Sequence, residues 1–281
     1  MRLITTIDDV RAALAAQRST GRIGLVPTMG NLHEGHMALV EAARRTSDIT
    51  VVSVFVNPMQ FGPNEDFEAY PRTLQDDATL LERSGAEILF APSEFQMYPH
   101  GRAGHTTLSV PRLSNILCGA HRPGHFDGVA TVVLKLFNIV APQLAFFGEK
   151  DFQQLTLIRT FCSELDLPID VIGVSTIRAA DGLALSSRNR YLSADERTTA
   201  PLIHQTLTRI TTALAGGNRD YATLEHDAGA RLKVAGFSVD YLSIRSARTL
   251  DPPTSSDREL VVLAAARIGR TRLIDNLRVR V

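Results

Sequence analysis

The chain has 281 residues, enough for one large domain or two smaller ones with a sizeable core. Its 30 Lys and Arg residues balance 30 Asp and Glu residues, which argues against a nucleic-acid partner because such surfaces need clustered positive charge. Hydrophobic residues form 44% of the chain and charged residues 21%, which is the composition of an ordinary soluble globular protein.

The two cysteines, Cys118 and Cys162, have no metal-type spacing and cannot form a disulfide framework, so we expect buried thiols in a reducing compartment. The first residues lack the apolar region of a secretory signal. No apolar run approaches the roughly 20 residues that span a bilayer. These features predict a cytoplasmic protein with no membrane segment.

The first part of the chain alternates predicted strands and helices. The run 49–56 is rich in β-branched residues and apolar nearly throughout, which is typical of an interior strand of a parallel sheet. In chain order we expect a helix over 8–18, a strand over 23–26, a helix from about residue 34 to 45, a strand over 49–56, a helix over 73–84, a strand over 87–91, a helix over 129–140, a strand over 144–147, a helix over 153–165 and a strand over 169–174. This alternation predicts an α/β fold with a doubly wound, Rossmann-like parallel sheet in residues 1–175.

The character of the sequence changes after about Thr176. Two helical segments, roughly 195–215 and 220–234, are separated by two glycines and an asparagine. Three strands are expected near 237–245, 259–266 and 271–279. Helices followed by adjacent strands predict a smaller α+β C-terminal domain over residues 176–281.

The stretch from Pro27 to His36 follows a predicted strand and leads into a predicted helix. Unpaired backbone N–H groups and the positive end of the helix dipole favour an anion at such a turn, above all a phosphate. His33 and His36 would donate hydrogen bonds to nucleotide phosphates, so we interpret the turn as a nucleotide site. Two alternatives stay open: one histidine caps the helix, or the pair binds a metal together with His121 and His125.

Two further segments are candidate anion sites. The turn Gly148–Asp151 ends a strand and opens a helix, so Lys150 would meet phosphate oxygens, and Asp151 would accept from a ribose hydroxyl or help to hold Mg²⁺. The alternative there is a solvated helix start with an acidic cap. In the second domain, the run Ser186–Arg188 offers two hydroxyls and a guanidinium as a compact anion grip, or else forms a helix-capping loop.

Neutral amide side chains lie at strand ends and at a helix start. Asn57, Gln60 and Gln154 could orient a small polar substrate without competing as nucleophiles, although amides also commonly close turns. Weaker candidates for metal and phosphate contacts are Asp76, Asp77 and Arg122.

Together these stretches resemble the pantoate–β-alanine ligase family, which belongs to the nucleotidyltransferases with the HIGH signature. The shared superfamily pattern is His33-Glu34-Gly35-His36, and several of the other blocks are family-specific. The matching blocks span nearly the whole chain, in order: residues 27–36, 54–61, 124–129, 147–154, 181–189 and 272–276. Two positions depart from the family pattern: Asn31 stands where alanine is usual, and Gln143 replaces a common aspartate.

The resemblance implies a two-step ligation that uses Mg²⁺ and ATP. Pantoate would attack the α-phosphate to give pantoyl adenylate and pyrophosphate, and β-alanine would then displace AMP to give pantothenate. A carboxylate is a poor acyl donor until adenylation supplies a leaving group. The second domain would act as a lid that excludes water from the adenylate. A homodimer is also implied.

The resemblance also assigns residues to roles, with His36 as the nominal proton donor. The implied catalytic residues are His33, His36, Lys150, Ser186, Ser187 and Arg188. The implied ATP-binding residues are Met29, Gly30, Asn31, Leu32, His33, Glu34, Gly35, His36, Gly148, Glu149, Lys150, Asp151, Ile177, Leu185, Ser186, Ser187 and Arg188. Pantoate would be bound by Asn57, Gln60 and Gln154, β-alanine would border Gln60, and Asp77 is the candidate metal ligand.

Two rival functions remain from the sequence. One is another HIGH-type adenylyltransferase that leaves AMP on a small product, although the blocks around Gln60 and Gln154 weigh against it. The other is a non-catalytic nucleotide-binding module, which would bind ATP without releasing pyrophosphate when pantoate is added.

Overall fold

The computed structural model describes residues 1–19, 21–63 and 65–281. These residues form two compact units. The first comprises Met1–Glu149 and Leu157–Ser175, and the second comprises Lys150–Thr156 and Thr176–Val281. Within the described ranges, no helix is both long enough and apolar enough to cross a membrane.

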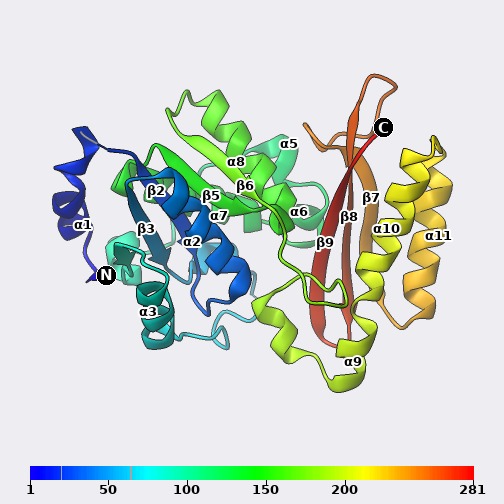
Figure 1. Cartoon of the computed structure of the whole chain (residues 1–281), viewed down its shortest axis with the longest axis horizontal. Coiled ribbons are helices and arrows are strands. Elements are labelled where there is room, and N and C mark those ends of the chain that lie inside the picture. Colours follow the sequence, from blue (N-terminus) through cyan, green and yellow to red (C-terminus); the bar gives the residue numbers. More distant parts are fainter. Residues whose placement is uncertain (20, 64) are drawn as a thin grey trace. The chain divides into compact units, whose positions relative to one another are not determined.

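The first unit is built on a six-stranded sheet in which every neighbouring pair is parallel (Figure 1). The strands, in their order across the sheet, are β1 (Arg2–Ile4), β4 (Ile88–Phe90), β3 (Ile49–Val54), β2 (Ile23–Thr28), β5 (Leu144–Gly148) and β6 (Asp170–Val174). The predicted doubly wound sheet is therefore confirmed. Strand β1 was not predicted, because three residues with a single buried side chain carry no readable period.

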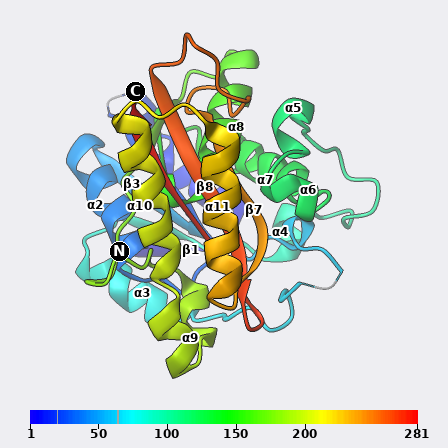
Figure 2. The ribbon, with the colours of Figure 1, turned by 90° about the vertical axis from the view of Figure 1, so that its right-hand side faces the viewer.

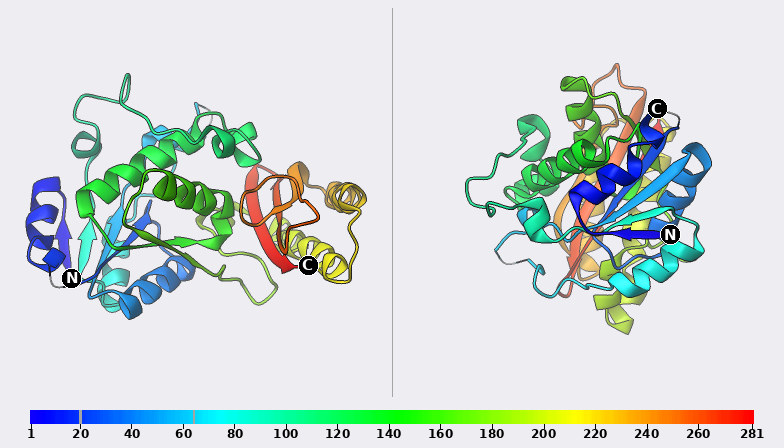
Figure 3. Two further views of the ribbon diagram at one scale, coloured as in Figure 1. Left: turned by 90° about the horizontal axis from the view of Figure 1, so that it is seen from above. Right: turned by 90° about the vertical axis from the view of Figure 1, so that its left-hand side faces the viewer.

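Helices cover both faces of this sheet (Figure 3). Apolar residues of α2 (Glu34–Thr46) and α3 (Leu74–Arg83) share a core with β2, β3, β4 and β5. Helix α7 (His125–Val140) lies on the opposite face in Figure 3. The remaining helical elements that precede β6 are α1 (Ile7–Leu14), η1 (Gln17–Ser19), η2 (Pro58–Gln60), α4 (Glu94–Met97), α5 (Pro111–Ser114), α6 (Cys118–His121), η3 (Glu149–Asp151) and α8 (Phe152–Glu164). The predicted helix over 8–18 is thus shorter, ending at Leu14, and both cysteines are buried as expected.

Gln143, one of the two departures from the family pattern, extends the sheet at its amino-terminal side. Its Oε1 accepts a hydrogen bond from the Ile23 amide at 2.8 Å, and its own amide donates to the Ile23 carbonyl at 3.1 Å. The Gln143 carbonyl accepts from the Asp170 amide at 2.9 Å. The side chain and backbone of Gln143 therefore together link β2, β5 and β6.

The second unit contains an antiparallel sheet in the order β7 (Ser238–Ser246), β8 (Glu259–Ile268) and β9 (Thr271–Arg280). Helices α10 (Leu202–Ala215) and α11 (Tyr221–Val234) lie side by side across one face (Figure 2), with η4 (Ser187–Tyr191) and α9 (Ala194–Thr199) before them. The predicted α+β character is confirmed. The single helix expected over 195–215 is wrong: it divides near Pro201, whose ring and missing N–H interrupt the helical ladder.

Because all strands of the first unit are parallel, their carboxyl ends open on one edge of the sheet. Strand β2 ends at Thr28 and leads to the turn before α2, while β3 ends at Val54 and leads to Asn57. Strand β5 ends at Gly148 on the same edge. The topology therefore brings three candidate segments, far apart in sequence, to one place.

Candidate active site

The two histidines of the turn before α2 cap that helix with their own rings. His33 is the N-cap residue, and its Nδ1 accepts a hydrogen bond from the Gly35 amide at 3.1 Å. His36 Nδ1 accepts from the His33 amide at 3.3 Å, and the two ring centroids lie 4.2 Å apart. The capping alternative is confirmed. Because each Nδ1 is an acceptor, the proton of each neutral imidazole is on Nε2, which makes Nε2 a donor for an anion.

Asp77, on the first turn of α3, holds the backbone just before these histidines. Its carboxylate is 3% exposed and accepts from the Asn31 amide at 3.0 Å and the Leu32 amide at 2.8 Å. The Thr73 hydroxyl donates to it at 3.2 Å. At Gly30, which has a φ of 79°, a Cβ would lie 2.9 Å from Asp77 Oδ2, so only glycine fits. These contacts favour a positioning role for Asp77, and its metal-binding role stays a prediction.

The four-histidine metal site is wrong. Among residues 1–19, 21–63 and 65–281, no group of three or more His, Cys, Asp or Glu side chains is placed to hold a metal ion. His125 has other partners: its Nδ1 lies 2.7 Å from the Gln60 carbonyl and its Nε2 lies 2.9 Å from Arg122 Nη1. A carbonyl only accepts, so Nδ1 carries the proton and Nε2 accepts from the guanidinium.

Asn57 and Gln60 meet in a buried hydrogen-bond network after β3. Asn57 is 1% exposed, and its Nδ2 donates to Gln60 Oε1 at 3.1 Å and to the Gly128 carbonyl at 3.1 Å. The Tyr98 hydroxyl donates to Asn57 Oδ1 at 2.7 Å. Because Gln60 Oε1 is already an acceptor, the Gln60 Nε2 group is the donor, and it contacts Met29 Sδ at 3.2 Å. The structure therefore brings Met29, Asn57 and Gln60 together.

Tyr98 is a site residue that sequence reasoning missed. It is 2% exposed, and burial together with the nearby charge of Glu94 raises its pKa, so the hydroxyl stays protonated and keeps donating. No spacing rule links it to Asn57, which lies 41 positions earlier. The backbone at Gly128 packs closely against that of Met59, because a Cβ on Gly128 would lie only 2.2 Å from the Met59 carbonyl oxygen. Glycine at this position therefore allows the Gly128 carbonyl to reach Asn57.

An ion pair fixes the backbone of Gln60. Arg122 contacts Glu65 through two hydrogen bonds of 2.6 Å, and Arg122 Nη2 also donates to the Gln60 carbonyl at 3.4 Å. Burial acts to raise the pKa of Glu65, but the hydrogen bond and charge of Arg122 hold that pKa below its ordinary value. Arg122, a weak phosphate candidate from the sequence, thus has an internal carboxylate partner.

The remaining predicted residues belong to the second unit, apart from Gly148 and Glu149. Lys150 lies in η3, and its ammonium group is 3.4 Å from the half-exposed carboxylate of Asp151. Gln154 lies half-buried in the first turn of α8. Ser186 caps η4, since its hydroxyl accepts from the Arg188 amide at 3.3 Å. The second-unit members of the predicted set are Lys150, Asp151, Gln154, Ile177, Leu185, Ser186, Ser187 and Arg188.

Comparisons with known proteins agree over the full length. A family model described as pantoate-beta-alanine ligase matches residues 2–278. The chain is 56% identical to the pantothenate synthetase of Stutzerimonas stutzeri (strain A1501), over 99% of this chain and 97% of that protein. It is 56% identical, with the same coverage, to the pantothenate synthetase of Pseudomonas putida (strain W619).

Solved structures agree as well. The crystal structure of pantothenate synthetase from Thermus thermophilus has a TM-score of 0.92 and 45% identity, and the match covers 99% of each chain. The pantoate-beta-alanine ligase of Francisella tularensis, crystallised with beta-gamma ATP and beta-alanine, has a TM-score of 0.82 and 33% identity over 99% of this chain and 97% of that one. This chain belongs to the pantoate–β-alanine ligase family.

Proposed function

We infer that this chain is an ATP-dependent ligase that joins pantoate to β-alanine through an amide bond and releases AMP and pyrophosphate. The observation that carries this conclusion is the family match over residues 2–278, supported by relatives with the same named activity over 99% of the chain. The Francisella relative was crystallised with an ATP form and β-alanine, two of the three substrates proposed here.

In the first step, the pantoate carboxylate attacks the α-phosphorus of ATP, and pyrophosphate leaves. An anion attacking a triphosphate needs donors and positive charge around the phosphates. We assign this role in the first unit to the Nε2–H groups of His33 and His36, whose tautomer the helix caps define. The groups assigned in the second unit are Lys150, Ser186, Ser187 and Arg188, and the other predicted ATP contacts extend along the same turns.

We propose that ATP reacts as its Mg²⁺ complex, because Mg²⁺ neutralises phosphate charge and is bound by a few carboxylates together with substrate oxygens. The half-exposed carboxylate of Asp151 fits such a role. Asp77 fits it less well, since both of its oxygens accept backbone hydrogen bonds.

The neutral amides would bind pantoate. Asn57 fixes the Gln60 carboxamide so that its Nε2 group donates, which suits a carboxylate or hydroxyl oxygen of pantoate. Gln154 is proposed as a second amide contact, and β-alanine would border Gln60. These groups orient the substrate and do not compete with it as nucleophiles.

In the second step, the β-alanine amine attacks the acyl carbon of pantoyl adenylate, the C–N bond forms and AMP leaves. Water would hydrolyse the adenylate, so we propose that residues 176–281 serve as a lid while residues 1–175 carry the nucleotide and pantoate sites. We further propose a homodimer in the cytoplasm, and light scattering of the purified protein would test the oligomeric state.

The direct test is to mix the protein with Mg·ATP and D-pantoate and to measure pyrophosphate, then to add β-alanine and measure AMP and pantothenate. We expect pyrophosphate in the first stage and both other products in the second. ATP binding without pyrophosphate would favour the non-catalytic module. Pyrophosphate with other carboxylic acids, but not with pantoate, would favour another adenylyltransferase.

A further inference from the structure

Asp275 is a buried carboxylate on β9 whose ion pair and hydrogen bonds lie inside the second unit. It is 5% exposed and forms a two-point ion pair with Arg178, at 2.7 Å between Nη1 and Oδ2 and 2.8 Å between Nη2 and Oδ1. The Asn276 amide donates to Oδ1 at 2.7 Å. Burying a charge destabilises a fold unless the charge is paired in this way, so Asp275 needs Arg178 and the Asn276 amide as partners.

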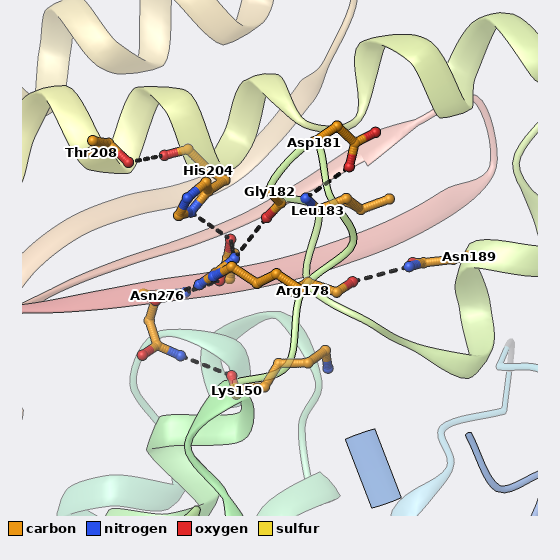
Figure 4. Close-up of polar contacts among 11 residues, drawn as sticks. Lys150, Arg178, Asp181, Gly182, Leu183, Asn189, His204, Thr208 and Asn276 are labelled. Carbon is orange, nitrogen blue, oxygen red and sulfur yellow. Dashed lines mark hydrogen bonds and ion pairs between the residues drawn. The ribbon is translucent and has the colours of Figure 1, made fainter. Parts of the chain in front are cut away.

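Arg178 connects the Asp275 carboxylate to the hairpin that precedes Ser186, and Figure 4 shows Arg178 beside Gly182 of this hairpin. Residues 177–185 form a short hairpin, in which Arg178 bridges to Ala184 and the Leu185 amide donates to the Ile177 carbonyl at 2.9 Å. The Arg178 guanidinium also donates to the carbonyls of Gly182, at 3.0 Å, and Asn276, at 3.3 Å. The guanidinium therefore fastens the hairpin to β9, and the hairpin runs directly into Ser186.

Asn276 connects the same strand to the other proposed phosphate-binding segment (Figure 4). Successive side chains of a strand point to opposite faces, so Asn276 is directed away from Asp275. Its Nδ2 group donates to the Lys150 carbonyl at 2.9 Å, and the residue is 6% exposed. Two adjacent residues of β9 thus hold two segments that lie far apart in sequence.

His204 on α10 approaches the carboxylate but does not balance its charge. Its Nδ1 is 3.8 Å from Asp275 Oδ2. Burial, followed by the charge of Arg178, lowers the pKa of His204 although Asp275 opposes the shift, so the ring is neutral at pH 7. Arg178 is therefore the cation that compensates Asp275, and the pair depends on the guanidinium fork.

We propose that Asp275 and Asn276 are positioning residues for ATP: through Arg178 and the Lys150 carbonyl, they set the spacing between the Lys150 ammonium and the Ser186–Arg188 donors so that both grip one triphosphate. The proposal rests on the ATP-binding role assigned above to those two segments. Neither positioning residue needs to touch ATP. Misplacing a binding group by about 1 Å can cost on the order of 100-fold in rate, so loss of the Asn276 or Asp275 contacts should measurably weaken the enzyme's use of ATP.

The test compares Asn276→Ala and Asn276→Asp with a control variant in the same sheet. Asn276→Ala removes the donor to Lys150, while Asn276→Asp keeps its shape but places an acceptor against a carbonyl. Asp240→Asn is the control, because it breaks a similarly buried ion pair with Arg272, 2.7 Å long between β7 and β9, that involves neither proposed phosphate-binding segment.

We expect both Asn276 variants to raise the KM for ATP at least tenfold, with the larger rise in Asn276→Asp, while the KM for pantoate, whose proposed contact Gln154 follows Lys150 in the first turn of α8, rises by a smaller factor. The control should leave both values within twofold. Arg178→Lys, which keeps the charge and loses the fork, should weaken ATP binding to an intermediate degree. Circular dichroism at the assay temperature would show that each variant is folded.

An unchanged KM for ATP in both Asn276 variants would overturn the proposal, as would an equal rise in the KM values of ATP and pantoate. Calorimetric titration with a non-hydrolysable ATP analogue separates this outcome from failure of the proposed reaction. If the wild type releases no pyrophosphate, the ligase assignment fails. Analogue affinity that falls in the Asn276 variants but not in Asp240→Asn would still support the positioning role.

Discussion

Two of the turns proposed to bind phosphate, the turn before α2 and Ser186–Arg188, are fixed in different ways. The turn before α2 is held largely by its own residues, because His33 and His36 cap the helix that follows them. The Ser186–Arg188 segment has one local cap, which Ser186 forms. The hairpin before it is held by the ion pair between Arg178 and Asp275, two residues that lie 97 positions apart in the sequence. Contacts within a turn can be predicted from its own sequence, whereas contacts that reach a turn from a distant strand cannot.

The largest expected effect comes from replacing His36 by a residue that keeps its helix-capping hydrogen bond but lacks the imidazole Nε2–H group. His36→Gln should lower the rate of pyrophosphate release by roughly two to four orders of magnitude with unchanged stability, because glutamine at the third helical position also accepts from the N-cap amide. His36→Ala should lose the activity and also about 0.5–2 kcal/mol of stability. Rate assays and urea denaturation measure the two effects, and near-normal turnover in His36→Gln would contradict the assigned role.

Lys150 tests whether the Gly148–Asp151 turn, like Ser186–Arg188, is held through its backbone by β9. Lys150→Met should lower kcat roughly 100-fold or more, since it removes a cation from the phosphates. The unfolding midpoint should stay near that of the wild type, because Asn276 holds the Lys150 carbonyl and not its side chain. A large loss of stability would show that the ammonium group itself has a structural role.

Tyr98 tests a distant contact in the first unit, because it holds Asn57 and Gln60, to which we assign pantoate binding. Tyr98→Phe removes the donor to Asn57 Oδ1 and should raise the KM for pantoate about tenfold, at a cost of about 1 kcal/mol in stability. The KM for ATP should remain unchanged. Steady-state kinetics with each substrate varied in turn would reveal the difference, and equal effects on both substrates would argue against the Tyr98–Asn57–Gln60 network.

Glu65 predicts a pH dependence of stability. Because its folded-state pKa lies below the ordinary value of 4.5, ionised Glu65 stabilises the fold above pH 4.5, and this contribution is lost as the pH falls through the folded-state pKa. Glu65→Gln should therefore be less stable than the wild type at pH 7, with the difference shrinking below pH 4.5. Denaturant titrations at several pH values measure it, and a constant difference would refute the pairing with Arg122.

The smallest expected effect concerns Asn31, the departure from the family pattern in the first turn. Its φ of 52° lies in the left-handed region, which asparagine tolerates better than alanine does. Asn31→Ala should cost roughly 1 kcal/mol or less, while Asn31→Gly should be neutral or slightly stabilising. Thermal unfolding would measure both. A stabilising alanine would mean that the backbone is not the reason for asparagine at this position.

Much of the fold could be predicted, because buried parallel strands and amphipathic helices have distinct periods. The turns around His36, Lys150 and Ser186 were also recognisable from local sequence. The residues that hold them were not: Tyr98 reaches Asn57, and Asp275 reaches Arg178, only after the chain has folded. The contacts of Asp77 could not be predicted either, since a carboxylate that accepts backbone N–H groups looks the same in sequence as one that binds a cation, and its metal-binding role stays a prediction.

The segment Lys150–Thr156 belongs to the second unit although it lies between two strands of the first, so the chain passes from one unit to the other three times. A cut at residue 176 therefore does not yield a complete module. A chimera that exchanges only residues 176–281 with a relative would pair one protein's Asn276 with another protein's Lys150 segment. Exchanging 150–156 along with the C-terminal residues keeps that contact within one parent, which makes it the sounder unit for recombination.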